Sequence, residues 1–97
     1  MFTLDSLRNQ LLTLRPHLEQ DWHVRRLGVF GSYASGKATP ESDLDMLVEF
    51  SQVPGWDFFD LEDELSTRLG IKVDLTTPGG LHPRLADTIL ASTQYVF

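Results

Sequence analysis

The segment DLDMLVEF, at residues 43–50, most constrains how this chain can fold. Its polar and apolar residues alternate, which is typical of a β-strand with one face in the core. The apolar face carries Leu44, Met46, Val48 and Phe50, and the other face carries Asp43, Asp45, Leu47 and Glu49. Asp43 and Asp45 therefore project from the same face, where two negative charges repel each other when they are poorly solvated. A strand that begins in this way indicates that something positive lies between the two carboxylates.

Apolar spacing elsewhere in the chain predicts the other elements. Leucines recur at helical spacing from Leu4 to Leu18, with a bend or a restart expected at Pro16. Gly70 is expected to end the second helix as a left-handed C-cap, and a short helical turn is expected after Ser32. The predicted helices are 4–18, 56–69 and 83–92, and the predicted strands are 24–30, 43–50 and 71–76. The side chains expected to face inward from the last helix are Leu85, Ile89 and Leu90.

Length and composition narrow the class of protein. The chain has 97 residues, which fits one compact domain over residues 1–97. It contains no cysteine, which excludes disulfides, thiol nucleophiles and cysteine-ligated zinc. The formal net charge is −6 and the basic residues do not cluster, so we do not expect direct binding of nucleic acid. No apolar run approaches the roughly 20 residues that cross a bilayer, and the N-terminus lacks a secretory signal. We expect a cytoplasmic protein.

A third aspartate is placed to join the first two. Asp74 lies in the predicted strand 71–76, between two apolar residues that share the opposite face. If this strand neighbours the strand that begins at Asp43 and Asp45, all three carboxylates share one patch. Oxygen donors favour a hard cation, and Mg²⁺ or Mn²⁺ is bound by one or two carboxylates together with phosphate oxygens and water. The sequence therefore predicts a metal site at these three aspartates.

The turn before the acidic strand is suited to a phosphate group. In the Gly31-Ser32 pair, the missing Cβ atom lets backbone approach an anion, and the serine hydroxyl adds a donor. Lys37 lies in the small-residue loop that follows, and Ser42 ends that loop. We therefore predict that these four residues bind the phosphates of a nucleotide that arrives with the metal ion.

These features together resemble the nucleotidyltransferase superfamily to which DNA polymerase beta belongs. Its pattern is Gly-Ser, a short spacer, Asp-x-Asp on a strand and a later acidic residue. Nearly the whole chain is similar to the minimal nucleotidyltransferases, the antitoxin partners of HEPN ribonuclease toxins. The similar segments are LGVFGSYASGKATPESDLDMLVEF, KVDLTTPGGL and HPRLADTIL. The resemblance implies an α+β fold, with a small mixed β-sheet and helices packed against it.

The resemblance also implies roles for the residues of the predicted site. Gly31 and Ser32 would hold the phosphates of ATP, Asp43 and Asp45 would bind magnesium, and Asp74 would complete the acidic set. The implied reaction transfers AMP from ATP to a tyrosine hydroxyl of a HEPN toxin, with which the chain would form a hetero-oligomer.

One position departs from the family pattern and keeps two alternatives open. Ser35 stands where family members commonly carry arginine, and a serine cannot supply the fixed positive fork that suits phosphate. The first alternative is an antitoxin that neutralises its toxin by contact, with the acidic helix 56–69 facing a basic partner. The second is transfer of a nucleotide to a small molecule or to RNA.

Overall fold

The computed structural model describes residues 3–97, which form a four-stranded sheet with helices on both faces. The strand order is β3-β2-β1-β4, with β2 and β3 parallel and the other two pairs antiparallel. This mixed sheet with packed helices confirms the predicted fold class. The elements are α1 (Leu4–Asp21), β1 (Val24–Phe30), α2 (Gly31–Ser35), β2 (Leu44–Phe50), α3 (Asp57–Leu69), β3 (Val73–Thr76), the 3₁₀ helix η1 (Pro78–Gly80), α4 (Pro83–Ser92) and β4 (Gln94–Tyr95).

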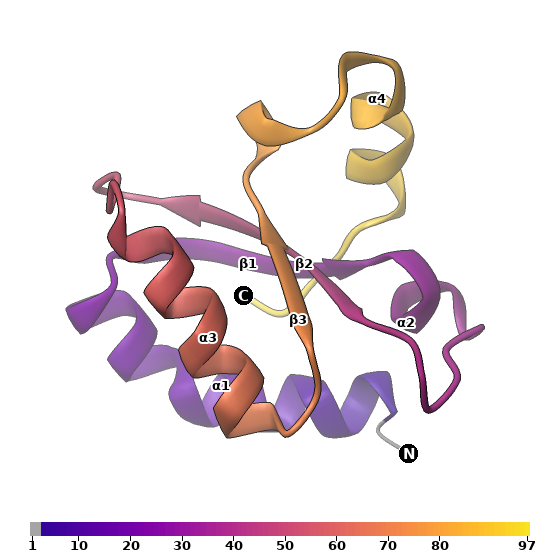
Figure 1. The fold of residues 1–97 in the computed structure, drawn as a ribbon, viewed down its shortest axis with the longest axis horizontal. Coiled ribbons are helices and arrows are strands. Elements are labelled where there is room, and N and C mark those ends of the chain that lie inside the picture. Colours follow the sequence, from indigo (N-terminus) through magenta and orange to yellow (C-terminus); the bar gives the residue numbers. More distant parts are fainter. Residues whose placement is uncertain (1–2) are drawn as a thin grey trace.

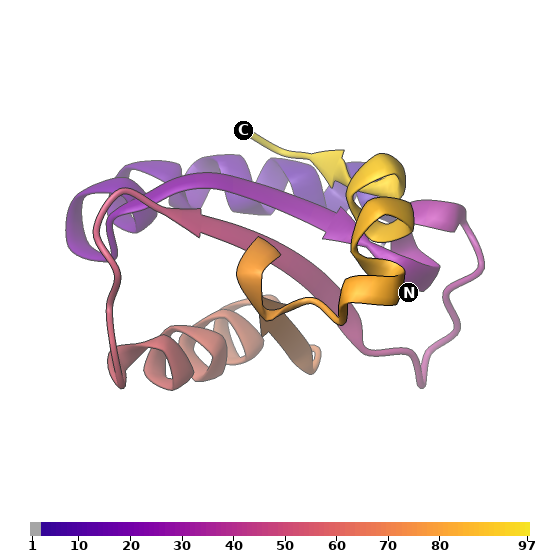
Figure 2. The same ribbon diagram turned by 90° about the horizontal axis from the view of Figure 1, so that it is seen from above.

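The sheet separates two unequal layers. Figure 1 shows α1 and α3 below the sheet, and η1 with α4 above it. In the view from above, α1 and α3 flank the strands, and α4 stands over the end of the sheet where β1 leads into α2 (Figure 2). The main core lies between the sheet and the pair α1 and α3. No helix within residues 3–97 is long and apolar enough to cross a membrane.

The first helix is longer than predicted. Thr3 caps its N-terminus by accepting a hydrogen bond from the Ser6 N–H (3.1 Å). The helix continues through Pro16 and ends at Asp21, three residues beyond the predicted limit. Burial of Leu18 beyond the proline accounts for the continuation, since the helix must keep this side chain in the core to complete its apolar face. Its fully buried side chains are Leu7, Leu11 and Leu18.

The alternation predicted for β2 is present in the structure. Leu44, Met46 and Val48 are fully buried against the helices, whereas the carboxylate of Asp45 lies on the opposite face. The helix α3 connects β2 to the parallel strand β3, its residues Leu61, Leu65 and Leu69 are buried, and it ends at Gly70 with a φ of 72°. That left-handed C-cap confirms the prediction for this glycine.

Two predictions near the C-terminus were wrong. In α4, Leu85 is 54% exposed and Leu90 is 37% exposed, so neither side chain faces inward, while Ile89 is half-buried. The reason is that α4 lies on the thin side of the sheet, where no second helix from residues 3–97 covers its outer face (Figure 2). The sequence also did not predict β4. That strand forms through a tertiary contact, because Tyr95 is paired with Gly28 of β1, and the Val96 N–H that follows donates to the Leu27 carbonyl (2.8 Å).

Candidate active site

The two strands that carry the predicted acidic residues are neighbours. Asp45 of β2 lies directly across from Asp74 of β3 in the parallel register. Residues that are paired across neighbouring strands point to the same face of the sheet, so both carboxylates face η1 and α4. Asp43 immediately precedes β2, and alternation places it on the same face. The structure thus brings all three predicted aspartates to one end of the sheet.

Asp45 occupies the least favourable position of the three for a negative charge. Its side chain is half-buried, whereas Asp74 and Asp43 are exposed. Burial raises the pKa of Asp45 above the ordinary value of 3.8, and the negative charges of Asp74 and Asp43 raise it further. A cation next to Asp45 would relieve both causes, because it restores favourable interactions to the charged form.

Lys72 partly neutralises the outermost aspartate. The Leu44 N–H donates to the Lys72 carbonyl (2.8 Å), which fixes the register of β2 and β3. The Lys72 Nζ atom then lies 3.8 Å from Asp43 Oδ2. Sequence reasoning missed this contact, although the signal was present, since Lys72 lies two residues before Asp74 on the same strand face.

A glycine allows the backbone to lie against the Asp45 carboxylate. Gly31 has a φ of 70°, and a Cβ atom at this position would overlap Asp45 Oδ2. The register explains the proximity, because Phe30 at the end of β1 is paired with Asp45. Glycine is therefore required at residue 31 for two reasons. The backbone there is left-handed, and the adjacent Asp45 carboxylate leaves no space for a Cβ atom.

Among residues 3–97, the predicted nucleotide-binding hydroxyl of Ser32 makes no hydrogen bond, whereas that of Ser42 makes one within its own loop. No hydrogen bond from residues 3–97 involves the Ser32 hydroxyl, and its carbonyl accepts from the Lys37 N–H (2.9 Å). The Lys37 side chain itself is exposed. Ser42 lies beside Asp43, but its hydroxyl accepts from the Thr39 N–H (2.8 Å) within the loop. The Ser35 hydroxyl donates to the Ser32 carbonyl (3.2 Å) and so braces the turn.

The carboxylates of Asp43, Asp45 and Asp74 fit a hard cation if the Asp43 side chain turns toward Asp45. Among residues 3–97, no three His, Asp or Glu side chains converge on one point as metal ligands. Asp43 is instead paired with Lys72, whose Nζ atom lies 3.8 Å from Asp43 Oδ2. The Asp43 side chain is 46% exposed, so it can turn toward Asp45 without disturbing the core. The carboxylate oxygens are the ligands that Mg²⁺ and Mn²⁺ prefer.

Comparison with known proteins gives the class to which this fold and site belong. The chain belongs to the nucleotidyltransferase domain family, whose model matches residues 11–96. It is 38% identical over 97 residues to the protein adenylyltransferase MntA of Thermococcus cleftensis, an alignment that covers 99% of this chain and 98% of the relative. A relative from Methanocaldococcus jannaschii, provisionally named a protein adenylyltransferase, is 39% identical over 98 residues, covering 99% of this chain and 100% of that protein. The chain is therefore a nucleotidyltransferase.

Solved structures confirm the architecture. A structure provisionally described as a minimal nucleotidyltransferase superposes with a TM-score of 0.76 at 34% identity, covering 96% of this chain and 95% of that one. A toxin–antitoxin crystal structure with AMP-PNP superposes with a TM-score of 0.74 at 21% identity, covering 93% of this chain and 72% of that one. At this lower identity the likeness shows the fold alone.

Proposed function

We propose that this chain is a cytoplasmic antitoxin that transfers AMP from ATP to a tyrosine hydroxyl of a partner HEPN ribonuclease toxin. The observation that carries the proposal is the cluster of Asp43, Asp45 and Asp74 beside Gly31, in a chain that resembles MntA over nearly its full length. Transfer would inactivate the toxin, and the two proteins would form a hetero-oligomer. The same proposal names ATP as the nucleotide and magnesium as the metal ion.

The three aspartates would hold the magnesium. When bound, this ion supplies charge stabilisation for the transferring phosphoryl group and lowers the pKa of the attacking hydroxyl. Asp45, half-buried and backed by Gly31, has the most restricted carboxylate and would set the position of the site. Asp74 is exposed, so it is suited to take the proton that leaves the tyrosine. A bond forms between the tyrosine oxygen and the α-phosphorus, and the bond to pyrophosphate breaks.

The turn after β1 would hold the phosphates. Gly31 lets its backbone approach them, and the unengaged hydroxyl of Ser32 can donate. Lys37 contributes a mobile positive charge from the loop. Ser42 can take part only if its hydroxyl leaves the hydrogen bond with Thr39, so we assign it the smallest share of binding.

The test removes the two charges that flank the start of β2. Asp43→Asn with Asp45→Asn should abolish transfer from labelled ATP to the partner while circular dichroism shows a folded protein. The matched control is Asp5→Asn with Asp63→Asn, which removes the same charge from exposed positions outside the site and should leave transfer intact. Undiminished transfer by the first variant would refute the proposed site.

Neutralisation by contact is the second candidate function. It is favoured by Ser35, whose hydroxyl is bonded to the Ser32 carbonyl and which supplies no positive charge for phosphate. The same double variant separates the two candidates, since full protection from the toxin without transfer would show that contact suffices. Transfer to a small molecule or to RNA ranks lower, because residues 3–97 supply no dedicated domain for such an acceptor.

A further inference from the structure

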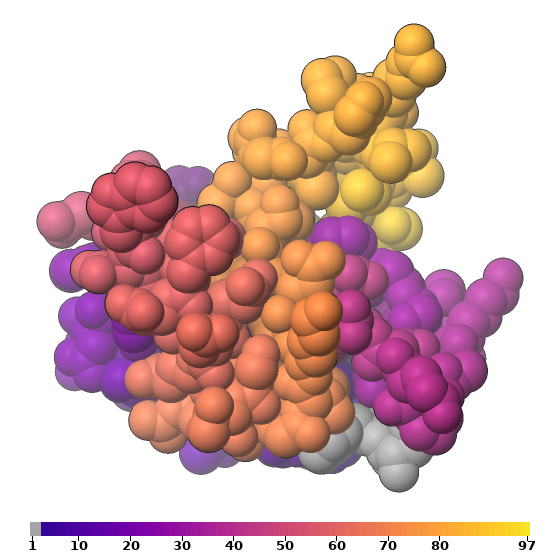
Figure 3. All heavy atoms as spheres, viewed as in Figure 1, coloured from indigo at the N-terminus to yellow at the C-terminus, as the bar shows by residue number. Residues whose placement is uncertain are grey.

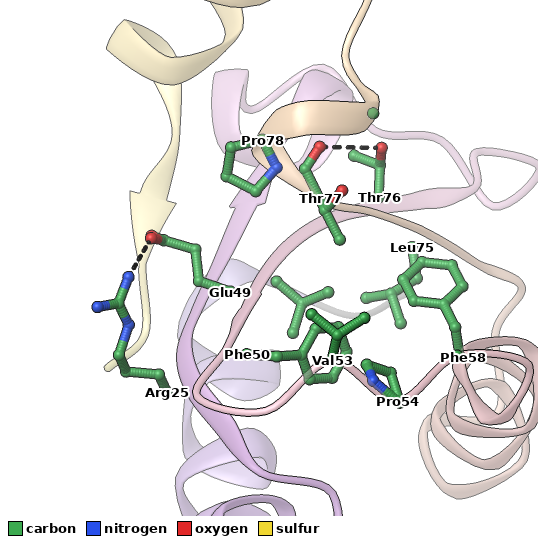
Figure 4. Close-up of a pocket in the computed structure, with 13 residues that line it drawn as sticks. Arg25, Glu49, Phe50, Val53, Pro54, Phe58, Leu75, Thr76, Thr77 and Pro78 are labelled. Atoms are coloured by element: carbon green, nitrogen blue, oxygen red, sulfur yellow. Dashed lines mark hydrogen bonds and ion pairs between the residues drawn. The ribbon is translucent and has the colours of Figure 1, made fainter.

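A cleft of about 580 Å³ lies at the opposite end of β2 from the aspartates. Its apolar side chains come from β2, from the loop before α3 and from β3, and Thr76, Thr77 and Pro78 close its upper end (Figure 4). Phe50 lies five residues beyond Asp45, a separation of about 16 Å along a strand. The Phe50 end of the cleft is therefore distant from Asp45, whereas Leu75 and Thr76 of its lining directly follow Asp74 in β3.

The cleft exists because β3 ends before β2 does. The parallel pairing extends only to Leu47 opposite Thr76, and the chain then turns away into η1. Thr77 would occupy the next pairing position, opposite Val48, and Pro78, the next residue that would donate to β2, has no N–H. The last part of β2, from Val48 to Phe50, thus has no strand beside it on this edge in the described part of the chain.

The unpaired edge presents backbone groups to the cleft. Backbone groups alternate along a strand, and the Leu44 N–H points to β3, where it reaches the Lys72 carbonyl. The Ser51 N–H points the other way, to the His23 carbonyl (2.8 Å) beside β1. It follows that the Val48 carbonyl and both backbone groups of Phe50 point toward the cleft.

Side chains of α3 cover the backbone N–H groups along the outer edge of β3, in contrast to the open edge of β2. There, the Val73 N–H donates to Ser66 Oγ (2.9 Å) and the Leu75 N–H donates to Glu62 Oε2 (2.8 Å). Such covering prevents unwanted pairing with another chain. Within residues 3–97, no side chain accepts a hydrogen bond from the Phe50 N–H.

Exposed apolar side chains border the open edge. Val53 is 84% exposed, Trp56 is 88% exposed and Phe59 is 58% exposed. Edge-to-face contacts from Phe50 to Phe58 (6.2 Å between ring centroids) and from Phe58 to Phe59 (5.5 Å) join the cleft to this border. In the space-filling view, the segment around residues 50–60 projects from the upper left of the molecule (Figure 3).

The charge around the border selects the kind of partner. Asp57 and Asp60 lie in the first turn of α3, next to Trp56 and Phe59, and both are exposed. Glu49 at the rim is paired with Arg25 (2.8 Å) and approached by Arg26 (3.9 Å), whereas Asp57 and Asp60 have no ion pair with any residue from 3 to 97. A basic segment with apolar side chains is complementary to this surface.

We infer that the cleft binds an extended, basic and apolar segment of the partner protein, which adds as a short strand to the edge of β2 at Val48–Phe50. Main-chain hydrogen bonds supply affinity in this mode of recognition, and the cleft selects the alternate side chains. Because the occupant belongs to the toxin that supplies the acceptor tyrosine, the inference rests on the proposed function. A segment bound at Phe50 would lie about 16 Å from Asp45, so one small protein could bind the cleft and reach the candidate active site at the same time.

The test uses the purified HEPN partner as the probe. Val53→Arg places a positive charge and a bulky side chain at the mouth of the cleft, so we expect at least about tenfold weaker binding by calorimetry. Leu12→Arg is the matched control, because Leu12 is also exposed (40%) but lies on α1, across the sheet from η1 and α4. In the complex, hydrogen exchange at the Phe50 amide should slow by at least about tenfold, as a new strand pairing requires.

The outcomes separate this inference from the proposed function. Equal binding by Val53→Arg, equal weakening by both arginine variants, or unchanged exchange at Phe50 would overturn strand addition, even if AMP transfer proceeds. Binding that is sensitive to Val53→Arg without any AMP transfer would support the inference and refute the transferase role. Absence of any complex with the partner would overturn both.

Discussion

Gly31 and Asp45 are in such close contact that a Cβ atom on residue 31 would overlap the carboxylate oxygen of residue 45. The contact joins the two halves of the candidate site, the turn that approaches phosphate and the strand that carries the acidic residues. It arises from the antiparallel register, in which Phe30 is paired with Asp45. The backbone at residue 31 and the half-buried carboxylate therefore cannot be changed independently.

Gly31→Ala should damage the candidate site more than Gly70→Ala does, although both substitutions strain a left-handed backbone. Gly70 has almost the same φ, 72° against 70°, but a Cβ atom there would meet nothing within 4 Å. We expect Gly70→Ala to cost about 1 kcal/mol of unfolding free energy and to leave AMP transfer unchanged. Gly31→Ala should cost more, by about 1–3 kcal/mol, and should abolish transfer, because Asp45 must move. Equal effects of the two substitutions on both stability and transfer would contradict the contact.

Asp45→Asn should stabilise the fold while removing activity. The pKa of Asp45 is raised in the folded state, so its stabilising contribution is complete below the ordinary value of 3.8 and is lost as the pH rises through the folded value. At neutral pH the ionised carboxylate is unfavourable, and a neutral amide removes this cost. We expect the midpoint of thermal unfolding at pH 7 without metal to rise by roughly 2–5 °C. Asp63→Asn, at an exposed position on α3, should leave it unchanged.

His17 should make stability depend on pH. Its Nε2 atom contacts Glu64 (2.8 Å) and its Nδ1 atom contacts Asp21 (2.5 Å), and Arg68 approaches Glu64 at 3.6 Å. The hydrogen bond with Glu64 raises the pKa of His17 above 6.5, and Asp21 raises it further, against the opposing effect of burial. The resulting stabilisation is complete below 6.5 and is lost as the pH rises through the folded value. Unfolding free energies measured in urea should therefore fall above pH 6.5, and His17→Gln should remove that fall.

Ser35→Arg should strengthen nucleotide handling. An arginine at the exposed end of α2 restores the planar positive fork that suits phosphate. We expect the KM for ATP to decrease by about threefold to tenfold, a change typical of one exposed charged contact. Ser35→Ala, which removes only the hydrogen bond to the Ser32 carbonyl, should leave the KM near its original value. Equal KM values for the arginine and alanine variants would show that residue 35 does not contact the nucleotide.

The alternation of residues 43–50 was sufficient to predict the orientation of β2, although Leu47 on the face of the aspartates is also buried and Phe50 on the apolar face is only partly buried. Helix α3 was predicted almost to its limits for a similar reason, since its apolar spacing and Gly70 both mark local structure. The pairing of Asp45 with Asp74 depended on which strands are neighbours. The sequence alone could not show that β2 and β3 are neighbours. The register of the two strands in the structure shows that they are.

Other features depend on contacts between distant segments, and periodicity could not predict them. Leu85 has helical spacing that predicts burial, yet it is exposed because no segment among the described residues covers that face of α4. Strand β4 forms against β1, where the Arg26 guanidinium lies 3.5 Å from the centroid of the Tyr95 ring. The end of β3 at Thr76 agrees with the predicted strand 71–76, but the open edge at Phe50 depends on the pairing of β2 with β3, which the sequence alone does not give.

Intact-mass analysis of the HEPN partner after incubation with ATP and Mg²⁺ tests the central claim most directly. The partner should gain the mass of AMP, fragmentation should place it on a tyrosine, and Asp43→Asn with Asp45→Asn should eliminate the gain. A partner whose mass is unchanged by the wild-type protein, or changed equally by the double variant, would contradict the assignment of this site.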